Sequence, residues 1–208
     1  MEIKVHKGAD SKCKYLNGCK FEYAKSTWSC EWNCVCDEDL MNAMILCIQE
    51  THLKFPSSNT EFHKFNFNIS NYLHGVVTCI QETIEIVSTK NICNNKIELV
   101  LLEVYFQCRI CIINVYVVPL VSISTIIEAI TTTKEQFRPN DNIFMLVGDF
   151  NIDINSNRKW SKQLLEYMQC EQLQEVTRNF ISWNKAIIGH IWTNFPLQQC
   201  HVHISHSY

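Results

Sequence analysis

The stretch Ile143-Phe-Met-Leu-Val-Gly-Asp-Phe-Asn151 decides the fold, because an uninterrupted apolar run ends there in an acid and an amide. The run predicts a short buried β-strand, and the turn-forming pair Asn140-Asp141 precedes it. A buried strand cannot hold a lone carboxylate in its middle, but its C-terminal end can, and open α/β sheets bind ligands at that edge. A second stretch, Ile45-Leu-Cys-Ile-Gln-Glu50, has the same design. Together they indicate a site built on two buried strands.

The polar ends of these two strands suggest a site for a divalent cation. In an extended chain the side chains of Asp149 and Asn151 point the same way, and Gly148 leaves room for close approach of a substrate backbone. Glu50 is expected to join them around a hard ion such as Mg²⁺, which binds few carboxylates and several waters. Each segment has an ordinary alternative: an Asx turn for Asp149 to Asn151, and a solvated strand end for Glu50.

Outward from these stretches, the pattern predicts an α/β protein in which strands outnumber helices. Asn94-Asn95 and Gln107 are plausible hairpin positions, and Ser122 or Ser124 can cap the first helix. Further strands are expected at Val76–Ile80, Thr83–Ser88, Ile97–Phe106, Arg109–Val118 and His190–Thr193, and helices through Phe137 and over Arg158–Cys170. Residues 1–36, rich in Lys and Cys, show no strand or helix period and are interpreted as a weakly ordered arm; residues 37–208 would form the domain.

The composition excludes several classes of protein but does not identify a binding partner. The chain has 208 residues, 47% hydrophobic and 19% charged, which excludes a disordered or collagen-like protein. No apolar run approaches the roughly 20 residues that a bilayer span needs, and the first residues lack the apolar region of a secretory signal. We therefore expect an intracellular protein, nuclear or cytoplasmic, with no membrane contact. The net charge of −3 does not indicate a basic nucleic-acid-binding face, nor does it exclude one.

The twelve cysteines are interpreted mainly as small buried hydrophobic residues, because nothing indicates export. Cys108 and Cys111 have the spacing of a zinc knuckle, but in a strand a separation of three places the two sulfurs on opposite faces. Five cysteines cluster in the first 36 residues. No second CxxC pair or paired histidines complete a zinc site there, so cysteines that bind no metal are favoured.

Four ordered blocks resemble one known family. They are Ile45-Leu-Cys-Ile-Gln-Glu-Thr-His-Leu53, Ile113-Asn-Val-Tyr-Val-Val-Pro119, Leu146-Val-Gly-Asp-Phe-Asn-Ile152 and His190-Ile-Trp-Thr-Asn194. The blocks resemble the endonuclease/exonuclease/phosphatase superfamily, and most of all the endonuclease domains associated with retrotransposon reverse transcriptases. The resemblance implies a four-layer α/β sandwich of two packed mixed β-sheets flanked by helices, incomplete at both ends. It also implies a phosphodiester hydrolase that uses Mg²⁺ or Mn²⁺ and acts on DNA.

The resemblance also implies roles for individual residues. Glu50 would bind the metal, Asp149 would orient or deprotonate the attacking water, and Asn151 would hold the phosphate. Tyr116 would hydrogen-bond the phosphate or the leaving group, although core packing with a satisfied hydroxyl is an equal alternative. His206 is the equivalent of the family's catalytic histidine.

The chain departs from the family pattern near its end. Where the resemblance implies an acidic residue before the last block, the chain has Gly189, and the segment His203-Ile-Ser205-His206 lacks the family's neighbouring Asp. Three functions therefore stay open. The first is a DNA endonuclease of mobile-element origin, with activity impaired by these changes. The second is a catalytically dead domain retained as a remnant or binding module. The third is a phosphatase or phospholipid esterase of the same superfamily.

Overall fold

The computed structural model describes only part of the chain. The described backbone comprises residues 2–7, 11–16, 19–25, 44–49, 65–69, 75–106, 108–135, 143–176, 189–196 and 201–206. Side chains are described for residues 44–49, 75–106, 108–135, 143–176 and 189–196.

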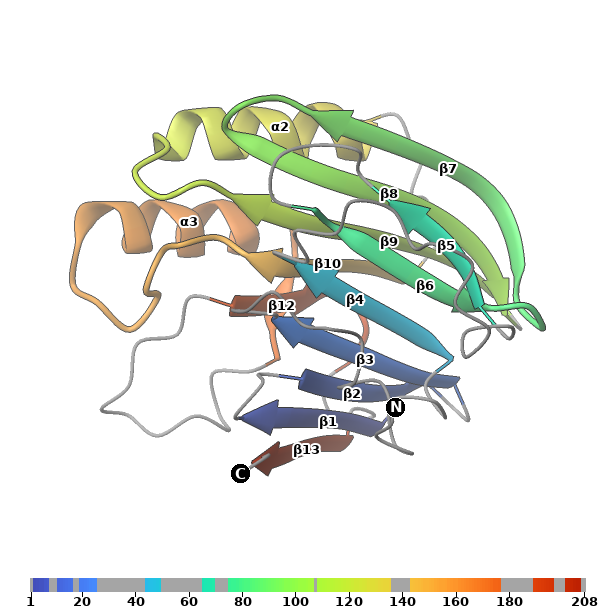
Figure 1. Cartoon of the computed structure of the whole chain (residues 1–208). Coiled ribbons are helices and arrows are strands. Elements are labelled where there is room, and N and C mark those ends of the chain that lie inside the picture. Colours follow the sequence, from blue (N-terminus) through green and yellow to red (C-terminus); the bar gives the residue numbers. More distant parts are fainter. Residues whose placement is uncertain are drawn as a thin grey trace.

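Two mixed β-sheets lie face to face (Figure 1). The seven-stranded sheet has the order β13-β1-β2-β3-β4-β6-β5 and the six-stranded sheet the order β11-β12-β10-β9-β8-β7. The strands of the first sheet are β13 (His201–His206), β1 (Glu2–Lys7), β2 (Ser11–Leu16), β3 (Cys19–Lys25), β4 (Ile45–Gln49), β6 (Val77–Gln81) and β5 (Phe65–Ile69). Those of the second are β11 (Gln174–Glu175), β12 (Gly189–Thr193), β10 (Ile143–Asp149), β9 (Cys108–Val117), β8 (Ile97–Phe106) and β7 (Glu85–Cys93).

Two hydrophobic cores lie on the opposite faces of the six-stranded sheet, because side chains alternate along each strand. Ile112 of β9 belongs to the core between the sheets, which also contains Ile45 and Ile80. Its neighbour Ile113 belongs to the core beneath helices α2 (Ile123–Glu135) and α3 (Lys159–Cys170). Both helices lie beside the six-stranded sheet (Figure 1). The predicted α/β architecture of two packed mixed sheets with outer helices is thus confirmed.

Most of the expected elements occur where local signals predicted them. Asn94 turns the chain between β7 and β8, since its Oδ1 accepts the backbone N–H groups of Lys96 and Ile97, both at 2.8 Å. Ser122, rather than Ser124, caps α2: its Oγ accepts the N–H of Thr125 at 3.3 Å. Strand β7 runs beyond the expected range because it pairs with β8 along its whole length.

Residues 1–36 differ from the expected arm. The structure has three strands there, β1 to β3, and β3 pairs in parallel with β4. Strand β1 pairs in parallel with β13, which lies near the other end of the sequence. The expectation that residues 1–30 contain no strand is therefore wrong. The domain boundary at residue 36 stays a prediction, because residues 26–43 lie outside the described part of the chain.

Three of the six described cysteines, Cys47, Cys79 and Cys111, are buried as predicted. Cys93 and Cys108 are only partly buried and Cys170 is exposed, so the expectation of a buried side chain is wrong for Cys170. Cys108 packs on the core between the sheets and Cys111 belongs to the core under the helices, so the predicted placement on opposite faces is confirmed. Burial raises the pKa of the Cys79 thiol to about 12. Burial, assisted by the charge of Glu103, raises the pKa of Cys111 to about 12 as well. The side chains of the five N-terminal cysteines lie outside the described residues.

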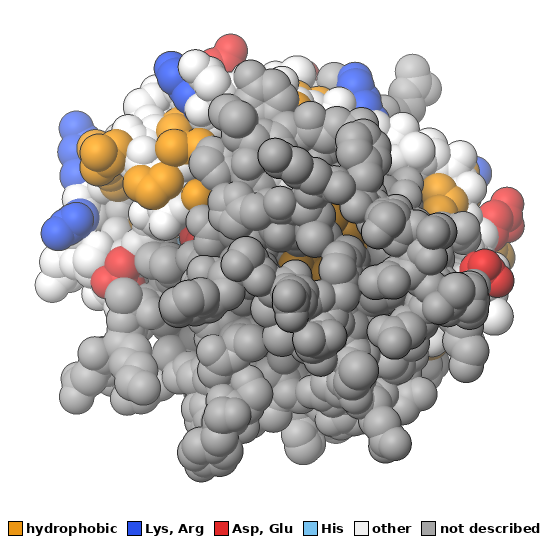
Figure 2. Space-filling model, in the orientation of Figure 1, with side chains coloured by type: hydrophobic (Ala, Val, Ile, Leu, Met, Phe, Trp, Pro, Cys, Tyr) orange, Lys and Arg blue, Asp and Glu red, His pale blue; other side chains and the backbone are white. Residues whose placement is uncertain are grey.

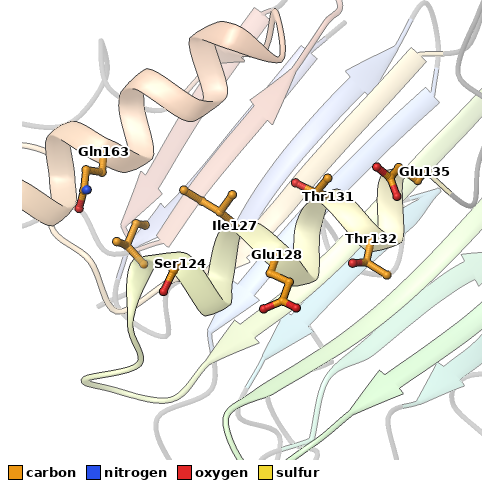
Figure 3. Close-up of a pocket in the computed structure, with 8 residues that line it drawn as sticks. Ser124, Ile127, Glu128, Thr131, Thr132, Glu135 and Gln163 are labelled. Atoms are coloured by element: carbon orange, nitrogen blue, oxygen red, sulfur yellow. The ribbon is translucent and has the colours of Figure 1, made fainter.

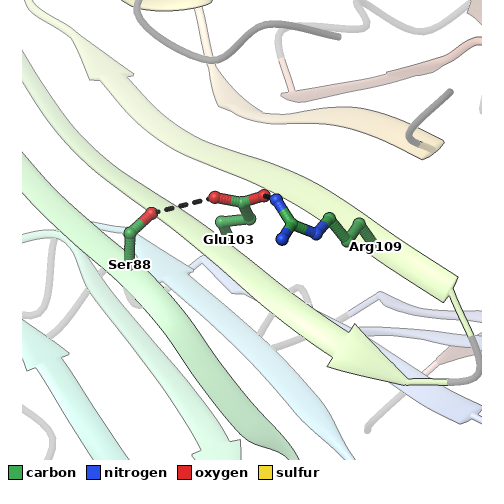
Figure 4. Close-up of polar contacts among 3 residues, drawn as sticks. All are labelled: Ser88, Glu103 and Arg109. Carbon is green, nitrogen blue, oxygen red and sulfur yellow. Dashed lines mark hydrogen bonds and ion pairs between the residues drawn. The ribbon is translucent and has the colours of Figure 1, made fainter. Parts of the chain in front are cut away.

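Polar contacts among Ser88, Glu103 and Arg109 join three neighbouring strands (Figure 4). Glu103 of β8 forms an ion pair with Arg109 of β9 at 3.1 Å, and the Ser88 hydroxyl of β7 donates to its other oxygen at 3.2 Å. The Arg109 side chain is 58% exposed, so the ion pair contributes little to the free energy of unfolding.

Within the described residues, no helix is long and apolar enough to cross a bilayer.

Candidate active site

Strands β9 and β10 place Tyr116 and Asp149 side by side. The two strands are parallel, and Tyr116 is the direct partner of Asp149 in their register. Tyr116 belongs to the core between the sheets, and Asp149 follows Met145 and Val147 of that core at two-residue intervals. Both residues are buried, with Asp149 fully so. Two candidate residues thus lie side by side at the C-terminal ends of parallel strands.

Asn151 joins this pair through a turn rather than through an extended chain. It has a left-handed φ of 50°, and its N–H donates to Asp149 Oδ1 at 2.9 Å, which makes an Asx turn. Its side-chain Nδ2 donates to the carbonyl of Val117 at 2.7 Å. The expected extended geometry from Asp149 to Asn151 is therefore wrong, because the strand ends at Asp149. The turn nevertheless returns the Asn151 amide to the end of β9, next to Tyr116.

Gly148 serves the sheet and not a substrate. A Cβ at this position would lie 2.6 Å from Val115 Cγ1 and 2.8 Å from the Val115 carbonyl carbon, with the carbonyl oxygen closer still. Val115 is the direct partner of Gly148 in the register of β9 and β10. The space left by the missing side chain is thus filled by the neighbouring strand. The expectation that Gly148 admits a substrate backbone is wrong for that reason.

Amide side chains connect the two sheets close to the site. Gln49, the last residue of β4, donates from Nε2 to Asn114 Oδ1 of β9. Asn114 Nδ2 donates in turn to the Val77 carbonyl at 2.9 Å and to Thr78 Oγ1 at 3.1 Å, both in β6. The second predicted strand end therefore lies against the strand that carries Tyr116. Glu50 itself is outside the described residues, so its role as a metal ligand stays a prediction.

Sequence reasoning did not identify Glu98, a fully buried acid on the same face as Tyr116. Glu98 in β8 is the direct partner of Tyr116, and Glu98 Oε2 accepts the N–H of Gly75 at 3.0 Å. The register therefore places an acid on each side of Tyr116, Glu98 on β8 and Asp149 on β10. An acid within the apolar run Ile97–Val104 is the signal that could have revealed it.

His190 supports the Asn151 turn from the opposite face of the sheet. It pairs with Gly148 in the register of β12 and β10, and its ring is fully buried. Nε2 lies 2.8 Å from the Ile152 carbonyl, which requires the N–H on that nitrogen. The ring also lies 5.4 Å from the ring of Phe150. The motif that begins at His190 thus holds both neighbours of Asn151.

The structure places two further predicted positions only by their backbone. Gly189 is the partner of Asp149 across β12 and β10. His206 ends β13, the edge strand of the seven-stranded sheet, and β1, β2 and β3 lie between β13 and β4 in the strand order. The His206 side chain lies outside the described residues, so its catalytic role stays a prediction. Among the described side chains, no three His, Cys, Asp or Glu residues are grouped to hold a metal ion.

A pocket of about 490 Å³ lies away from these residues, in the helical layer (Figure 3). It is formed by α2, including Ile127, Glu128, Thr131 and Glu135, with Gln163 from α3. None of the candidate residues of β9 or β10 lines it.

Comparison with known proteins supports the fold. No family model matches the chain, and no curated protein sequence matches it. Among solved structures, an endonuclease/exonuclease/phosphatase family protein from Bacteroides thetaiotaomicron has a TM-score of 0.59 with 12% identity over 74% of this chain and 70% of that chain. The endonuclease domain of TRAS1, a telomere-specific non-LTR retrotransposon, has a TM-score of 0.58 with 14% identity over 82% of each chain.

A mannosyl-6-phosphatase from Bacteroides thetaiotaomicron is similar to the same degree, with a TM-score of 0.58 and 12% identity over 79% of this chain and 74% of that chain. The chain therefore has the fold of the endonuclease/exonuclease/phosphatase proteins, which confirms the resemblance seen in the four sequence blocks. Identities this low establish the fold alone.

Proposed function

We propose that this chain is a metal-dependent phosphodiester hydrolase that cuts DNA and derives from a mobile element. One observation carries the proposal: Tyr116, Asp149 and Asn151, three polar residues from two sequence blocks, meet at the C-terminal ends of β9 and β10. Ligands of α/β sheets bind at such an edge. The similarity in fold to a retrotransposon endonuclease domain supports DNA as the substrate class.

Each residue has a group suited to one part of phosphodiester hydrolysis. The Asp149 carboxylate accepts the proton of the attacking water or orients that water. The Asn151 amide has two N–H groups; one donates to Val117 and the other is assigned to a phosphate oxygen. The Tyr116 hydroxyl donates to the phosphate or to the leaving oxygen. His206 is assigned as the catalytic histidine, as the family resemblance implies.

The donor atoms near the site fit a hard divalent cation. Asp149 and Asn151 contribute carboxylate and amide oxygens at the edge of the sheet, and Glu50 follows the last residue of β4. Oxygen atoms from amides and carboxylates are the ligands that Mg²⁺ and Mn²⁺ prefer. We assign the metal to Glu50. When bound, the ion would stabilise negative charge on the phosphate and lower the pKa of a bound water.

The described charged side chains on one face of the protein bear on how it would contact nucleic acid. On the face shown in Figure 2, the described Lys and Arg side chains stand in separate groups near the margin, and acidic side chains lie among them. We propose that the described side chains on this face neutralise few phosphates. Since each phosphate contact steepens the salt dependence of binding, we expect a shallow dependence of nicking on salt concentration.

Nicking of supercoiled plasmid by the full chain, with Mg²⁺, with Mn²⁺ and with a chelator, tests the proposal. Asp149→Ala should lower the rate at least roughly 100-fold, which is the contribution expected of a general base. Asp153→Asn is the matched control: Asp153 also forms an Asx turn, with Asn155, but lies outside the site. The control should nick like the unchanged chain.

The other outcomes separate the rival functions. Metal-dependent nicking that survives Asp149→Ala would refute the role of Asp149. A folded chain that binds DNA without nicking it would identify a catalytically dead binding module. Hydrolysis of a phosphate monoester without nicking would identify a phosphatase, a possibility that the fold of the mannosyl-6-phosphatase keeps open.

A further inference from the structure

The amides of Gln49 and Asn114 form a buried polar link between the two sheets. Both side chains are fully buried, and Nε2 of Gln49 donates to Oδ1 of Asn114. We propose that this Gln49–Asn114 bridge is a positioning device that sets where Glu50 stands relative to Tyr116 and Asp149. The inference rests on the proposed function and extends it to residues that do not touch the substrate.

The bridge fixes two strands of one sheet to one strand of the other. From β9, Asn114 accepts from Gln49 of β4 and donates to Val77 and Thr78 of β6. Its Nδ2 also lies 3.4 Å from the Ile48 carbonyl of β4. These contacts use the acceptor and both donor positions of one amide. Asn114 therefore determines where the ends of β4 and β6 lie along β9.

The bridge lies next to the candidate site along strand β9. Asn114 and Tyr116 are two residues apart on the same face of β9, a separation of roughly 7 Å. Asn114 is the partner of Val147, just as Tyr116 is the partner of Asp149. Glu50 follows Gln49 in the chain. A slide of one sheet over the other would therefore move the end of β4, which Glu50 follows, relative to Tyr116 and Asp149.

Stability alone does not account for the bridge. Contacts between apolar side chains are not directional, and an apolar pair of similar size would bury the same surface without a desolvation cost. Gln49 also has its Oε1 buried without a hydrogen-bond partner in the described structure, which makes the arrangement costly. Directional hydrogen bonds do what apolar contacts cannot, since they specify one register of the two surfaces.

The test replaces both amides by apolar side chains of similar volume, Gln49→Met with Asn114→Leu. Removing both partners of a buried hydrogen bond can leave stability nearly unchanged. Asn114→Leu also removes the donor to Val77 and Thr78, so we expect the double variant to fold with a lower melting temperature. Its affinity for Mn²⁺, measured by electron paramagnetic resonance on the folded variant, should fall at least tenfold. The Mg²⁺ concentration for half-maximal nicking should rise by a similar factor. Ser88→Ala, which removes a hydrogen bond to Glu103 outside the contacts of Asn114, is the control and should change neither the Mn²⁺ affinity nor the Mg²⁺ requirement more than twofold.

The outcomes distinguish the two proposals. If the unchanged chain binds no Mn²⁺ and nicks no plasmid, the proposed function fails and the positioning role fails with it. If the unchanged chain binds Mn²⁺ and the folded double variant binds it equally well, the positioning role is refuted while the function stands. Should the double variant not fold, Gln49→Met alone, which keeps the contacts of Asn114 with β6, decides by the same criterion.

Discussion

Replacing Gly148 by alanine should destabilise the protein strongly, although the change adds a single methyl group. The new Cβ would lie 2.6 Å from Val115 Cγ1 and closer to the Val115 carbonyl oxygen, whereas carbon atoms in contact are normally about 3.5–4.0 Å apart. The obstruction is mainly backbone of the adjacent strand, which cannot rotate away as a side chain can. Strands β9 and β10 would have to separate, at the point where Tyr116 and Asp149 pair.

The size of the effect follows from these contacts. Overpacking a close-packed interior costs about 1–3 kcal/mol, and a clash with backbone belongs at the upper end of that range. Replacing glycine by alanine also reduces the conformational entropy of the unfolded chain, which stabilises the folded state by about 0.4–1 kcal/mol. We therefore expect the free energy of unfolding to fall by about 2 kcal/mol. For a chain of this size the melting temperature should drop by roughly 4–8 °C.

Urea and thermal unfolding followed by circular dichroism measure this change. A second variant, Val115→Ala, removes the Cγ1 atom but leaves the carbonyl oxygen in place. Gly148→Ala should therefore cost about the same free energy in the Val115→Ala background as in the unchanged chain. An ordinary surface substitution changes the free energy of unfolding by no more than about 0.5 kcal/mol. If Gly148→Ala changes it by no more than that, the close approach of the two strands is refuted. Recovery in the double variant would show that the side chain, not the backbone, is the obstacle.

Three further predictions concern the helices and the thiols. Ser122→Ala removes the cap of α2 and should lower the free energy of unfolding by about 1 kcal/mol in urea, whereas Ser122→Asp should retain it; equal losses would contradict the capping role. With a thiol reagent on the folded protein, Cys170→Ser should remove one fast-reacting group because Cys170 is exposed, and Cys79→Ser should remove none. The pKa values of Cys79 and Cys111 are raised from 9.0 to about 12, so these thiols ionise near pH 9 only in the unfolded chain. Stability measured by urea unfolding should therefore fall as pH rises from 9 toward 12, less steeply in Cys79→Ala; an unchanged slope would contradict the burial of that thiol.

The central strands were predictable because their information is local. Strand β10 is a continuous apolar run that ends at a Gly-Asp pair, and the turn at Asn94 needs only its own side chain and the next three residues. The alternation in β9 also predicted that Cys108 and Cys111 would lie on opposite faces. In each case the spacing of apolar residues along the sequence indicates which side chains are buried.

Strands β1 to β3 were not predictable in this way. Their segments mix lysines, cysteines and apolar residues without a clear period. What makes them strands is pairing with distant segments: Glu2 is the partner of His201, and Phe21 of Ile45. Cross-strand pairing of this kind depends on the partner's position, about which a local window carries no information. The same reasoning applies to Glu98 and the Gln49–Asn114 bridge, which become visible only when the register is known.

The sequence presented an Asx turn and a functional site as alternatives at Asp149, but the two are compatible. The N–H of Asn151 uses one acceptor position of a carboxylate that has two oxygens and about four lone-pair sites. The left-handed φ of 50° that the turn requires is one that asparagine tolerates better than most residues, and it carries the amide back to Val117 at the end of β9. The turn is thus what brings the acid and the amide together. It follows that Asn151→Ala would disturb the backbone and the amide at once, whereas Asn151→Gly keeps the turn accessible and removes only the amide. Loss of nicking in Asn151→Gly, with the melting temperature little changed, would assign the amide to the substrate; full activity would confine its role to the turn.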